Sequence, residues 1–288
     1  MKPKIYIAKT LKNQDYGNIY EQLNNLSAIE LECLNNDYGN VWCRDYMPIK
    51  TAMGNYVQFN YKPEYMNSLK WKKHIPDYKQ LHNEIDIKNI FFSTIILDGG
   101  NVELYNKKAI VTDRIFRDNN AKNLEDQKNL DKKLRSALEV EKIIYIPQYP
   151  YDFTGHVDGL VRFVNDNTVL INNYLKEIKS IKDDKNNYRK KIMEQWHHSF
   201  MNILLNEGFN IKELTYNINE NDNSSAVGIY LNFLLLEKII LMPAFNNTLK
   251  DEEAASILEK IYHKKVIPIY AKELAKKGGI INCISWTF

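Results

Sequence analysis

The stretch from Gly159 to Asn172 reads GLVRFVNDNTVLIN, two apolar runs separated by three polar residues. The runs Gly159–Val164 and Thr168–Asn172 have the length and composition of β-strands. The polar stretch Asn165–Asn167 suits a short hairpin turn, because Asn and Asp tolerate the backbone conformations that turns require. A hairpin joins antiparallel strands, so this stretch argues against an all-parallel doubly wound sheet.

The same signals recur on both sides of this hairpin. Further strands are predicted at Lys4–Ala8, Tyr56–Tyr61, Ile90–Leu97, Ala109–Asp113, Lys142–Pro147, Val227–Leu236, Lys238–Met242 and Val266–Tyr270. Helices are predicted at Asp15–Asn25, Asn119–Val140, Tyr174–Asn206 and Asp251–His263, the third closed by Gly208 and the last opened by Thr248-x-x-Asp251, which has capping-box spacing. The class is therefore mixed α/β. Paired strands, a helix and a further strand recur about every 50–60 residues, which suggests a ring of modules.

Length and composition exclude several classes of protein. The chain has 288 residues, of which 44% are hydrophobic and 26% charged, so it can bury a full core and is not mainly disordered. No linker rich in Pro, Gly or Ser divides it, and we expect one domain over residues 1–288. The net charge of +3 is spread along the chain, which argues against nucleic acid as a partner.

The cysteines and the apolar stretches suggest a location. Cys33, Cys43 and Cys283 are an odd number without a CxxC pair, which fits a reducing compartment better than a disulfide framework or a thiolate zinc site. The N-terminus leads directly into a strand pattern without a secretory signal, and the apolar region Ile229–Phe245 is interrupted by polar residues. We expect a soluble, cytoplasmic protein with no membrane partner.

Four short stretches place polar or reactive residues in apolar, glycine-punctuated surroundings. They are Trp42–Pro48 (WCRDYMP), Asp98–Asn101 (DGGN), Gly155–Gly159 (GHVDG) and Gly278–Cys283 (GGIINC). No HExxH, P-loop or GxGxxG motif is present, which lowers the rank of metal and nucleotide chemistry.

His156 and Asp158 form the first candidate pair. If the stretch is extended, residues two apart project from the same face, so an imidazole and a carboxylate share one space. A structural His–Asp contact is an equal alternative, although the flanking glycines favour close approach of a ligand. A lone cysteine is more often a buried core residue than a nucleophile, but Cys283 follows a Gly-Gly turn and has His156 as a candidate partner.

Asp45 and Asp98 add two more carboxylates. Each has an equally plausible structural interpretation: Asp45 can pair with its neighbour Arg44, and Asp98 can be a turn residue before the two glycines.

In this order, the four stretches resemble the signatures of the agmatine deiminase and bacterial-type peptidylarginine deiminase family of guanidine-modifying enzymes. W-x-R-D-x-x-P, E/D-G-G-N, G-H-x-D and Gly-Gly-x-x-x-Cys are all present and span residues 42 to 283. Tyr230–Phe233 and Met242–Phe245 are similar to the family as well. The chain departs from the family in having Asp98 in place of Glu, and Asn282 where many agmatine deiminases have His.

The resemblance implies a five-bladed α/β propeller, the pentein fold, with pseudo-fivefold strand-strand-helix-strand modules. It also implies roles for residues of this chain: Cys283 as nucleophile, His156 as general acid/base, Asp45 and Asp158 as ligands of the guanidinium, and Asp98 as the residue that orients His156. Trp42 is expected to pack on the planar cation, and Arg44 and Asn101 are further candidate substrate-binding residues.

The predicted reaction is hydrolysis of a guanidinium to a ureido group and ammonia through a covalent cysteine thiouronium intermediate, without metal or organic cofactor. Agmatine, which would give N-carbamoylputrescine, is the first expected substrate. An arginyl peptide or another guanidine is the alternative within enzymes. A non-catalytic guanidine-binding protein and, more weakly, a cysteine protease are alternatives of other classes. A homo-oligomer is left open.

Overall fold

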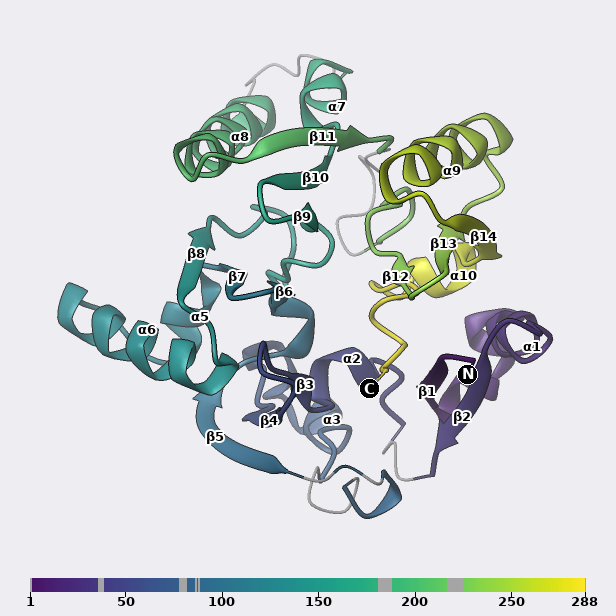
Figure 1. The fold of residues 1–288 in the computed structure, drawn as a ribbon, viewed down its shortest axis with the longest axis horizontal. Coiled ribbons are helices and arrows are strands. Elements are labelled where there is room, and N and C mark those ends of the chain that lie inside the picture. The colour runs from purple at the N-terminus through teal and green to yellow at the C-terminus, as the bar shows by residue number, and fades with distance from the viewer. Residues whose placement is uncertain are drawn as a thin grey trace.

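The computed structural model of the chain describes residues 2–35, 39–77, 82–85, 87, 89–180, 188–216 and 225–287. Within these residues the strands form five small sheets, and Figure 1 shows the sheets following one another around the middle of the molecule. The longer helices α6 (Leu124–Leu138), α8 (Tyr188–Asn206) and α9 (Thr248–Tyr262) lie on the outside of this arrangement.

Four of the sheets share one plan: an antiparallel pair of strands, then a helical connection, then a strand parallel to the second. They are β3 (Ile49–Lys50), β4 (Tyr56–Asn60) and β5 (Ile90–Ile96); β6 (Glu103–Tyr105), β7 (Lys108–Thr112) and β8 (Lys142–Ile146); β9 (Val161–Asn165), β10 (Thr168–Asn172) and β11 (Asn210–Leu214); and β12 (Leu234–Leu235), β13 (Ile239–Ala244) and β14 (Lys265–Tyr270). The hairpin predicted between Gly159 and Asn172 is confirmed as β9–β10.

The remaining sheet joins the two ends of the chain. β1 (Lys4–Ala8) and β2 (Glu30–Leu34) are parallel, and Trp286 pairs antiparallel with Tyr6 on the other edge of β1. Two backbone hydrogen bonds make this bridge, with N–O distances of 2.8 and 2.9 Å. The C-terminal residues thus supply the antiparallel partner that the other sheets obtain from a hairpin.

The remaining helical elements are short connections. They are α1 (Ile19–Asn24), α2 (Cys43–Tyr46), α3 (Leu69–Lys72), α5 (Arg114–Asp118), α7 (Tyr174–Ser180) and α10 (Lys272–Ala275), with 3₁₀ turns η1 (Lys9–Lys12), η2 (Gln14–Tyr16), η3 (Glu64–Met66), η4 (His82–Glu84) and η5 (Gly99–Asn101). Where the structure describes the chain, no helix is both long and apolar enough to cross a membrane.

Helix α6 shows why the longer helices form. Leu130, Leu134 and Leu138 recur every four residues and are buried, so one stripe of the helix packs on the sheet beside it. The Asn123 side chain accepts a hydrogen bond from the Asp126 backbone N–H at 2.9 Å and caps the N-terminus. Glu139 ends the helix with a left-handed backbone (φ 55°).

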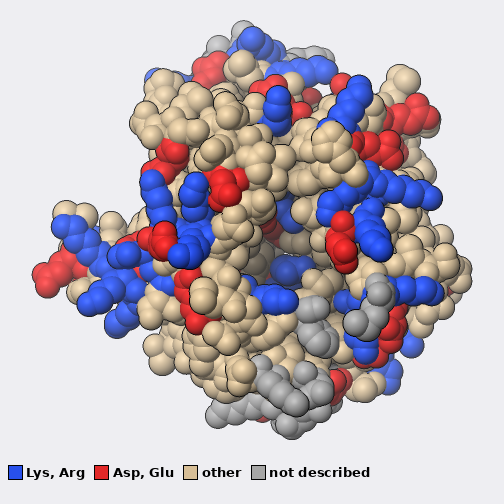
Figure 2. All heavy atoms as spheres, in the orientation of Figure 1, with Lys and Arg blue, Asp and Glu red and all other residues tan. Residues whose placement is uncertain are grey.

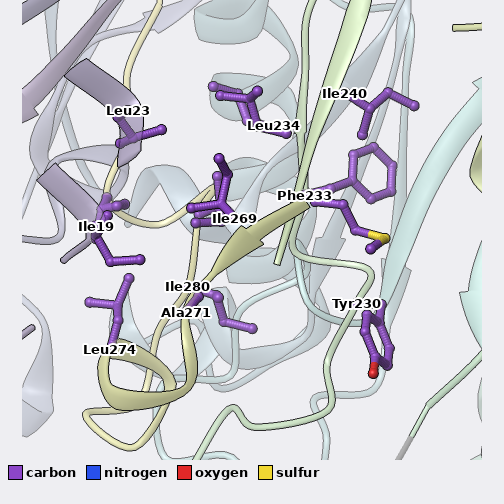
Figure 3. Packing of buried hydrophobic residues seen from close by; sticks show 14 of the residues in the cluster. Ile19, Leu23, Tyr230, Phe233, Leu234, Ile240, Ile269, Ala271, Leu274 and Ile280 are labelled. Atoms are coloured by element: carbon purple, nitrogen blue, oxygen red, sulfur yellow. The ribbon is translucent and has the colours of Figure 1, made fainter. Parts of the chain in front are cut away.

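One buried hydrophobic cluster connects the beginning and the end of the chain. Figure 3 shows Ile19 and Leu23 of α1 on one side of this cluster, with Ile269 of β14 between them and Ile240 of β13.

The face of the molecule that Figure 1 shows is hollowed near its centre, and Figure 2 shows basic side chains in this hollow.

Three predicted elements need correction. The predicted strand Val227–Leu236 is wrong over most of its length: only β12 is a strand, because Gly228 (φ 92°) turns the chain before it. The predicted helix Asp15–Asn25 begins at Ile19, and the helix predicted at Asn119–Val140 begins at Leu124 after the separate helix α5.

The helix predicted at Tyr174–Asn206 corresponds to α7 and α8, and residues 181–187 of it lie outside the described residues. Gly208 has a left-handed backbone (φ 79°) just after α8, as predicted. The cap of α9 is Asn247, one residue before the predicted Thr248, while the Asp251 carboxylate accepts the Asn247 backbone N–H at 3.1 Å.

Candidate active site

A cavity of about 610 Å³ brings residues of three of the four motif stretches together. Trp42 and Asp45 come from the start of α2, His156 and Asp158 from the segment between β8 and β9, and Cys283 from the C-terminal turn, and all five line the cavity. The fourth stretch, Asp98–Asn101, lies directly behind His156.

The two glycines of the fourth stretch permit this approach. A Cβ on Gly100 would lie 2.7 Å from both Asp45 Oδ1 and His156 Nδ1, and a Cβ on Gly99 would lie 2.0 Å from the backbone oxygen of Arg44. Gly100 also donates its N–H to Asp45 Oδ1 at 3.2 Å and accepts the Asp158 N–H at 3.1 Å. The backbone of turn η5 is therefore in direct contact with two other segments, Arg44–Asp45 and His156–Asp158. A side chain at either glycine would prevent this close approach.

His156 is held between two carboxylates. Its Nε2 lies 3.0 Å from Asp98 Oδ2 and its Nδ1 lies 3.6 Å from Asp45 Oδ1, and all three side chains are buried. Burial lowers the pKa of His156, but the charges of Asp45 and Asp98 and the hydrogen bond to Asp98 outweigh it and raise the pKa to about 10. The imidazole is therefore protonated at neutral pH.

The pKa of the Asp45 carboxyl group lies near neutral pH. Burial raises its pKa to about 7, and this rise is opposed by His156 and increased by Asp98 and Asp158. Its surroundings therefore disfavour the charged form of Asp45 relative to an exposed carboxylate.

Cys283 is surrounded by acceptors. Its Sγ lies 3.4 Å from Asn232 Oδ1 and 3.7 Å from Asp158 Oδ2. Burial raises the pKa of this thiol well above its ordinary value, and the nearby charges of Asp158 and Asp45 raise it further. Without a cation in the cavity, the sulfur is a neutral thiol.

Two neighbours of these groups received no role from the sequence. Asn282 donates its side-chain N–H to Asp158 Oδ2 at 2.7 Å and orients that carboxylate. Asn232 accepts the backbone N–H of Asn282 at 3.1 Å and faces the thiol of Cys283. The signal for Asn232 is a polar residue inside the apolar run from Ile229 to Leu236.

Arg44 and Asn101 lie elsewhere. Neither residue is among the described residues that line the cavity. Arg44 donates its Nε–H to the Asn282 carbonyl at 3.3 Å. The Asn101 side chain accepts the Thr112 backbone N–H at 3.0 Å. Both connect segments around the site, so their contacts favour a structural role over the predicted substrate contact.

The positions of Trp42, Cys43 and Cys33 follow from their packing. A Cβ on Gly279 would lie 2.5 Å from the Trp42 ring, so the Gly-Gly turn before Cys283 makes room for an indole that also lines the cavity. The Cys43 thiol is buried and donates to the Ile284 carbonyl at 2.9 Å, and Cys33 packs at the edge of the core, as expected for core cysteines.

The rest of the cavity is aromatic with a few charges. Its aromatic side chains include Tyr65, Tyr149, Tyr151 and Phe153, while the charged residues Asp152, Arg189 and Lys277 line it as well. The Arg189 guanidinium lies over the Tyr151 ring at 4.7 Å. A ligand with an apolar body and charged groups at its ends fits such a lining.

Comparisons with known proteins agree with this geometry. Agmatine deiminase of Medicago truncatula is 24% identical over 230 residues, which are 70% of this chain and 59% of that protein. Agmatine deiminase of Pseudomonas aeruginosa strain LESB58 is 26% identical over 209 residues, 66% of this chain and 56% of that protein. The chain thus matches less than two thirds of the length of these curated relatives.

Solved structures show the fold. A putative arginine deiminase from Porphyromonas gingivalis has a TM-score of 0.72 at 16% identity, covering 100% of this chain and 95% of that one. Agmatine deiminase of C. jejuni has a TM-score of 0.68 at 15% identity, with 99% and 92% covered. The chain thus has the pentein fold of these proteins.

The family model of the Porphyromonas-type peptidyl-arginine deiminases matches residues 4–288, which include every motif described above. The chain belongs to the Porphyromonas-type peptidyl-arginine deiminase family.

Proposed function

We propose that this protein is a deiminase that hydrolyses a guanidinium group to a ureido group and ammonia. The observation that carries the proposal is the convergence of Cys283, His156, Asp45 and Asp158 on one cavity, with His156 held between two carboxylates. The chemistry of a planar cation requires acceptors at its edges and a nucleophile above its plane, and these residue types supply both.

Asp45 and Asp158 bind the guanidinium in this proposal. Each charge-assisted hydrogen bond contributes roughly 1.5–3 kcal/mol, and a forked arrangement fixes orientation as well. In the empty cavity Asp158 helps to raise the pKa of Asp45, because two like charges repel. An arriving cation removes that repulsion and ionises Asp45.

The same cation activates the nucleophile. Burial and the charges of Asp158 and Asp45 disfavour the Cys283 thiolate, and a guanidinium between the carboxylates offsets the effect of their charges, so the thiol releases its proton to water as the substrate binds. Its sulfur attacks the guanidinium carbon and forms a C–S bond. The protonated His156 gives its proton to the departing nitrogen, the C–N bond breaks, and ammonia leaves a thiouronium intermediate.

The second half of the cycle uses the same groups. The now neutral His156 takes a proton from water, and the oxygen attacks the thiouronium carbon. The C–S bond then breaks, and the hydroxyl proton of the adduct passes to the leaving sulfur, which returns Cys283 as a thiol and releases the ureido product. Asp98 keeps the imidazole oriented through its hydrogen bond to Nε2, at 3.0 Å. Trp42 packs on the face of the cation in this proposal.

Agmatine is the first candidate substrate, because the curated relatives named above are agmatine deiminases. A C. jejuni agmatine deiminase of 15% identity has also been solved with substrate bound. An arginyl substrate is the second candidate, since the cationic side chains of Arg189 and Lys277 line the cavity and can face a carboxylate.

Further parts of the proposal concern the whole chain. We take residues 1–288 as one catalytic unit whose five sheets are the blades of a five-bladed α/β propeller, a view supported by the repeated strand plan. The three free cysteines support a cytoplasmic location.

Ammonia release from agmatine, free arginine and a peptide ending in arginine, measured in parallel, tests the function. We expect turnover of at least one of them by the wild-type protein, and Cys283→Ser should remain folded but lose turnover at least about a thousandfold. Asp158→Asn should raise KM roughly tenfold to a hundredfold, because one charge-assisted contact is lost.

Other outcomes separate the alternatives. Full ammonia release by Cys283→Ser would remove the nucleophile assignment. Calorimetric binding of a guanidine without any turnover would favour a non-catalytic binding protein. If arginyl substrates react, Lys277→Ala should lower kcat/KM for them and leave agmatine unaffected.

A further inference from the structure

Tyr65 contacts the group that orients His156. Its hydroxyl donates a hydrogen bond to Asp98 Oδ2 at 2.9 Å, and the same oxygen lies 3.0 Å from His156 Nε2. One carboxylate oxygen therefore accepts from a phenol and an imidazolium at once. Neither the motifs in the sequence nor the comparisons assign a role to Tyr65.

The Tyr65 ring is held in place by contacts with Phe153 and Arg114. Tyr65 lies in η3, and its ring meets the Phe153 ring edge to face, with 5.4 Å between centroids and an interplanar angle of 86°. The Arg114 guanidinium lies 5.6 Å from the Tyr65 ring centroid and donates to the Phe153 backbone carbonyl. The segment that carries His156 thus also holds the Tyr65 ring.

A second phenol, that of Tyr61, lies near Tyr65. Tyr61 is buried, and its hydroxyl donates to Met66 Sδ at 3.3 Å. The Asn40 side chain donates to the Tyr61 hydroxyl at 3.4 Å. Burial and the charge of Asp98 raise the pKa of Tyr65 well above its ordinary value, so its hydroxyl keeps its proton and remains a donor.

We propose that Tyr65 is a positioning residue that sets the strength of the Asp98–His156 hydrogen bond and thereby the acidity of His156 in the deimination proposed above. The proposal rests on that function only for its kinetic consequence. The hydrogen-bond arrangement and its effect on the imidazole can be measured in the resting protein.

The direction of the effect follows from shared charge. Two donors at one oxygen each receive less of its negative charge than one donor would, so the phenol weakens the pairing of Asp98 with His156. Without the phenol, the carboxylate pairs with the imidazolium alone, and the protonated form of His156 gains stability. The pKa of His156 should then rise, and the imidazolium becomes a poorer proton donor to departing ammonia.

The other charged groups around His156 stay in place when the Tyr65 hydroxyl is removed. Asp45 faces Nδ1 at 3.6 Å, Asp158 contributes at longer range, and the Asp152 carboxylate accepts the backbone N–H of His156 at 3.3 Å. None of these three groups hydrogen-bonds to the phenol in the contacts described above. A change in the titration of His156 therefore reports the bond between Tyr65 and Asp98.

The test is Tyr65→Phe, which keeps the ring and its packing on Phe153. We expect the pKa of His156, followed by ¹⁵N NMR of its imidazole without substrate, to rise by about 0.5–1, the equivalent of one ordinary hydrogen bond. With the substrate that proves active, kcat should fall roughly threefold to tenfold, while KM changes less than about twofold. Tyr262→Phe is the matched control, because it removes a phenol that donates to the Phe163 carbonyl at 3.0 Å, outside the cavity lining.

A second variant tests the sign in the opposite direction. Replacing Tyr65 with 3-fluorotyrosine makes the phenol a stronger donor, so the pKa of His156 should fall. An unchanged or lowered pKa of His156 in Tyr65→Phe, or an unchanged or raised one with fluorotyrosine, would overturn the inference. If wild type titrates as described but turns over no guanidine, the proposed function fails while the positioning role of Tyr65 stands.

Discussion

At the scale of single residues, the site combines a protonated imidazole with a protonated thiol. The carboxylates raise the pKa of His156 to about 10, while burial and then the same carboxylates raise the pKa of Cys283, so the proposed acid carries its proton and the proposed nucleophile is a neutral thiol. A cation resting against Asp45 and Asp158 offsets the effect of these carboxylates on Cys283 by supplying the opposite charge. In the proposed reaction a ligand without a cationic group would not lower the pKa of this thiol.

The pKa values of Asp45 and His156 predict how the proposed reaction depends on pH. Asp45 must be ionised to bind the cation, so KM should increase as the pH falls below about 7. In the proposed reaction His156 must be protonated to release ammonia, so kcat should decrease at alkaline pH. The pKa of about 10 applies without a bound cation, whose charge lowers it. A profile of kcat/KM against pH should therefore be bell-shaped.

Initial rates of ammonia release between about pH 5 and 11, at several substrate concentrations, check this expectation. The acid limb should appear in KM and the alkaline limb in kcat. A flat profile over that range would contradict the assigned roles of both residues.

At the scale of elements, the turn after β5 assembles the site. Gly99 packs on the backbone of Arg44, while Gly100 packs on the side chains of Asp45 and His156. The same turn, η5, begins after Asp98 and ends at Asn101, whose amide oxygen accepts from Thr112 in β7. Two neighbouring sheets and the segments that carry Asp45 and His156 therefore meet at Gly99 and Gly100.

Alanine substitutions at these glycines should have different effects. In Gly99→Ala the new Cβ meets backbone, which cannot move aside, so stability should fall by about 1–3 kcal/mol or more. In Gly100→Ala it meets two side chains, which can rotate, so the protein should fold but lose activity at least about a hundredfold.

Gly159→Ala is the matched control for stability only, because its Cβ would lie 3.8 Å from Ile229 Cγ2, an ordinary contact, while the residue itself lines the cavity. Thermal unfolding and ammonia release measured on all three variants check the prediction. Wild-type activity in Gly100→Ala would show that Asp45 and His156 need not lie at this distance.

Which elements could be predicted from sequence depends on what their side chains reveal. Lys4–Ala8 and Thr168–Asn172 are apolar strands and agree with the structure residue for residue. β2 and β11 were not predicted, because their sequences ELECL and NIKEL carry charges on partly exposed edge strands. The run Val227–Leu236 was mistaken for a strand, since burial makes a turn as apolar as a strand.

The site likewise has residues that the sequence predicts and contacts that it does not. The motifs that contain Asp45, His156, Asp158 and Cys283 are local in sequence, and the structure places all four at the cavity. The contact between Tyr65 and Asp98 joins residues 33 apart, with nothing in either local pattern to indicate it. Long-range hydrogen bonds of this kind require the fold to be known.

At the scale of the whole molecule, the position of Cys283, the proposed nucleophile, depends on how the two ends of the chain pair. Trp286 pairs with Tyr6 of β1, donates its indole N–H to the Pro48 carbonyl at 2.7 Å, and is 2% exposed. Between this anchor and the cavity, the Cys283 carbonyl accepts the Arg44 N–H at 3.0 Å. The backbone of the turn that carries Cys283 is thus tied to the first quarter of the chain, while Asn232 contacts its sulfur.

Trp286→Ala should weaken both closure and catalysis. Loss of the buried indole should lower the free energy of unfolding by about 3–5 kcal/mol, since the cavity it leaves cannot fully collapse. Activity at a temperature where the variant is still folded should also fall, because the turn carrying Cys283 loses its fixed end three residues away. Leu249→Ala, at a side chain that is 81% exposed, is the control and should change neither quantity. Chemical unfolding and ammonia release separate the two effects: a variant that loses stability but retains wild-type kcat when folded would show that the other contacts around Cys283 hold the sulfur in place without Trp286.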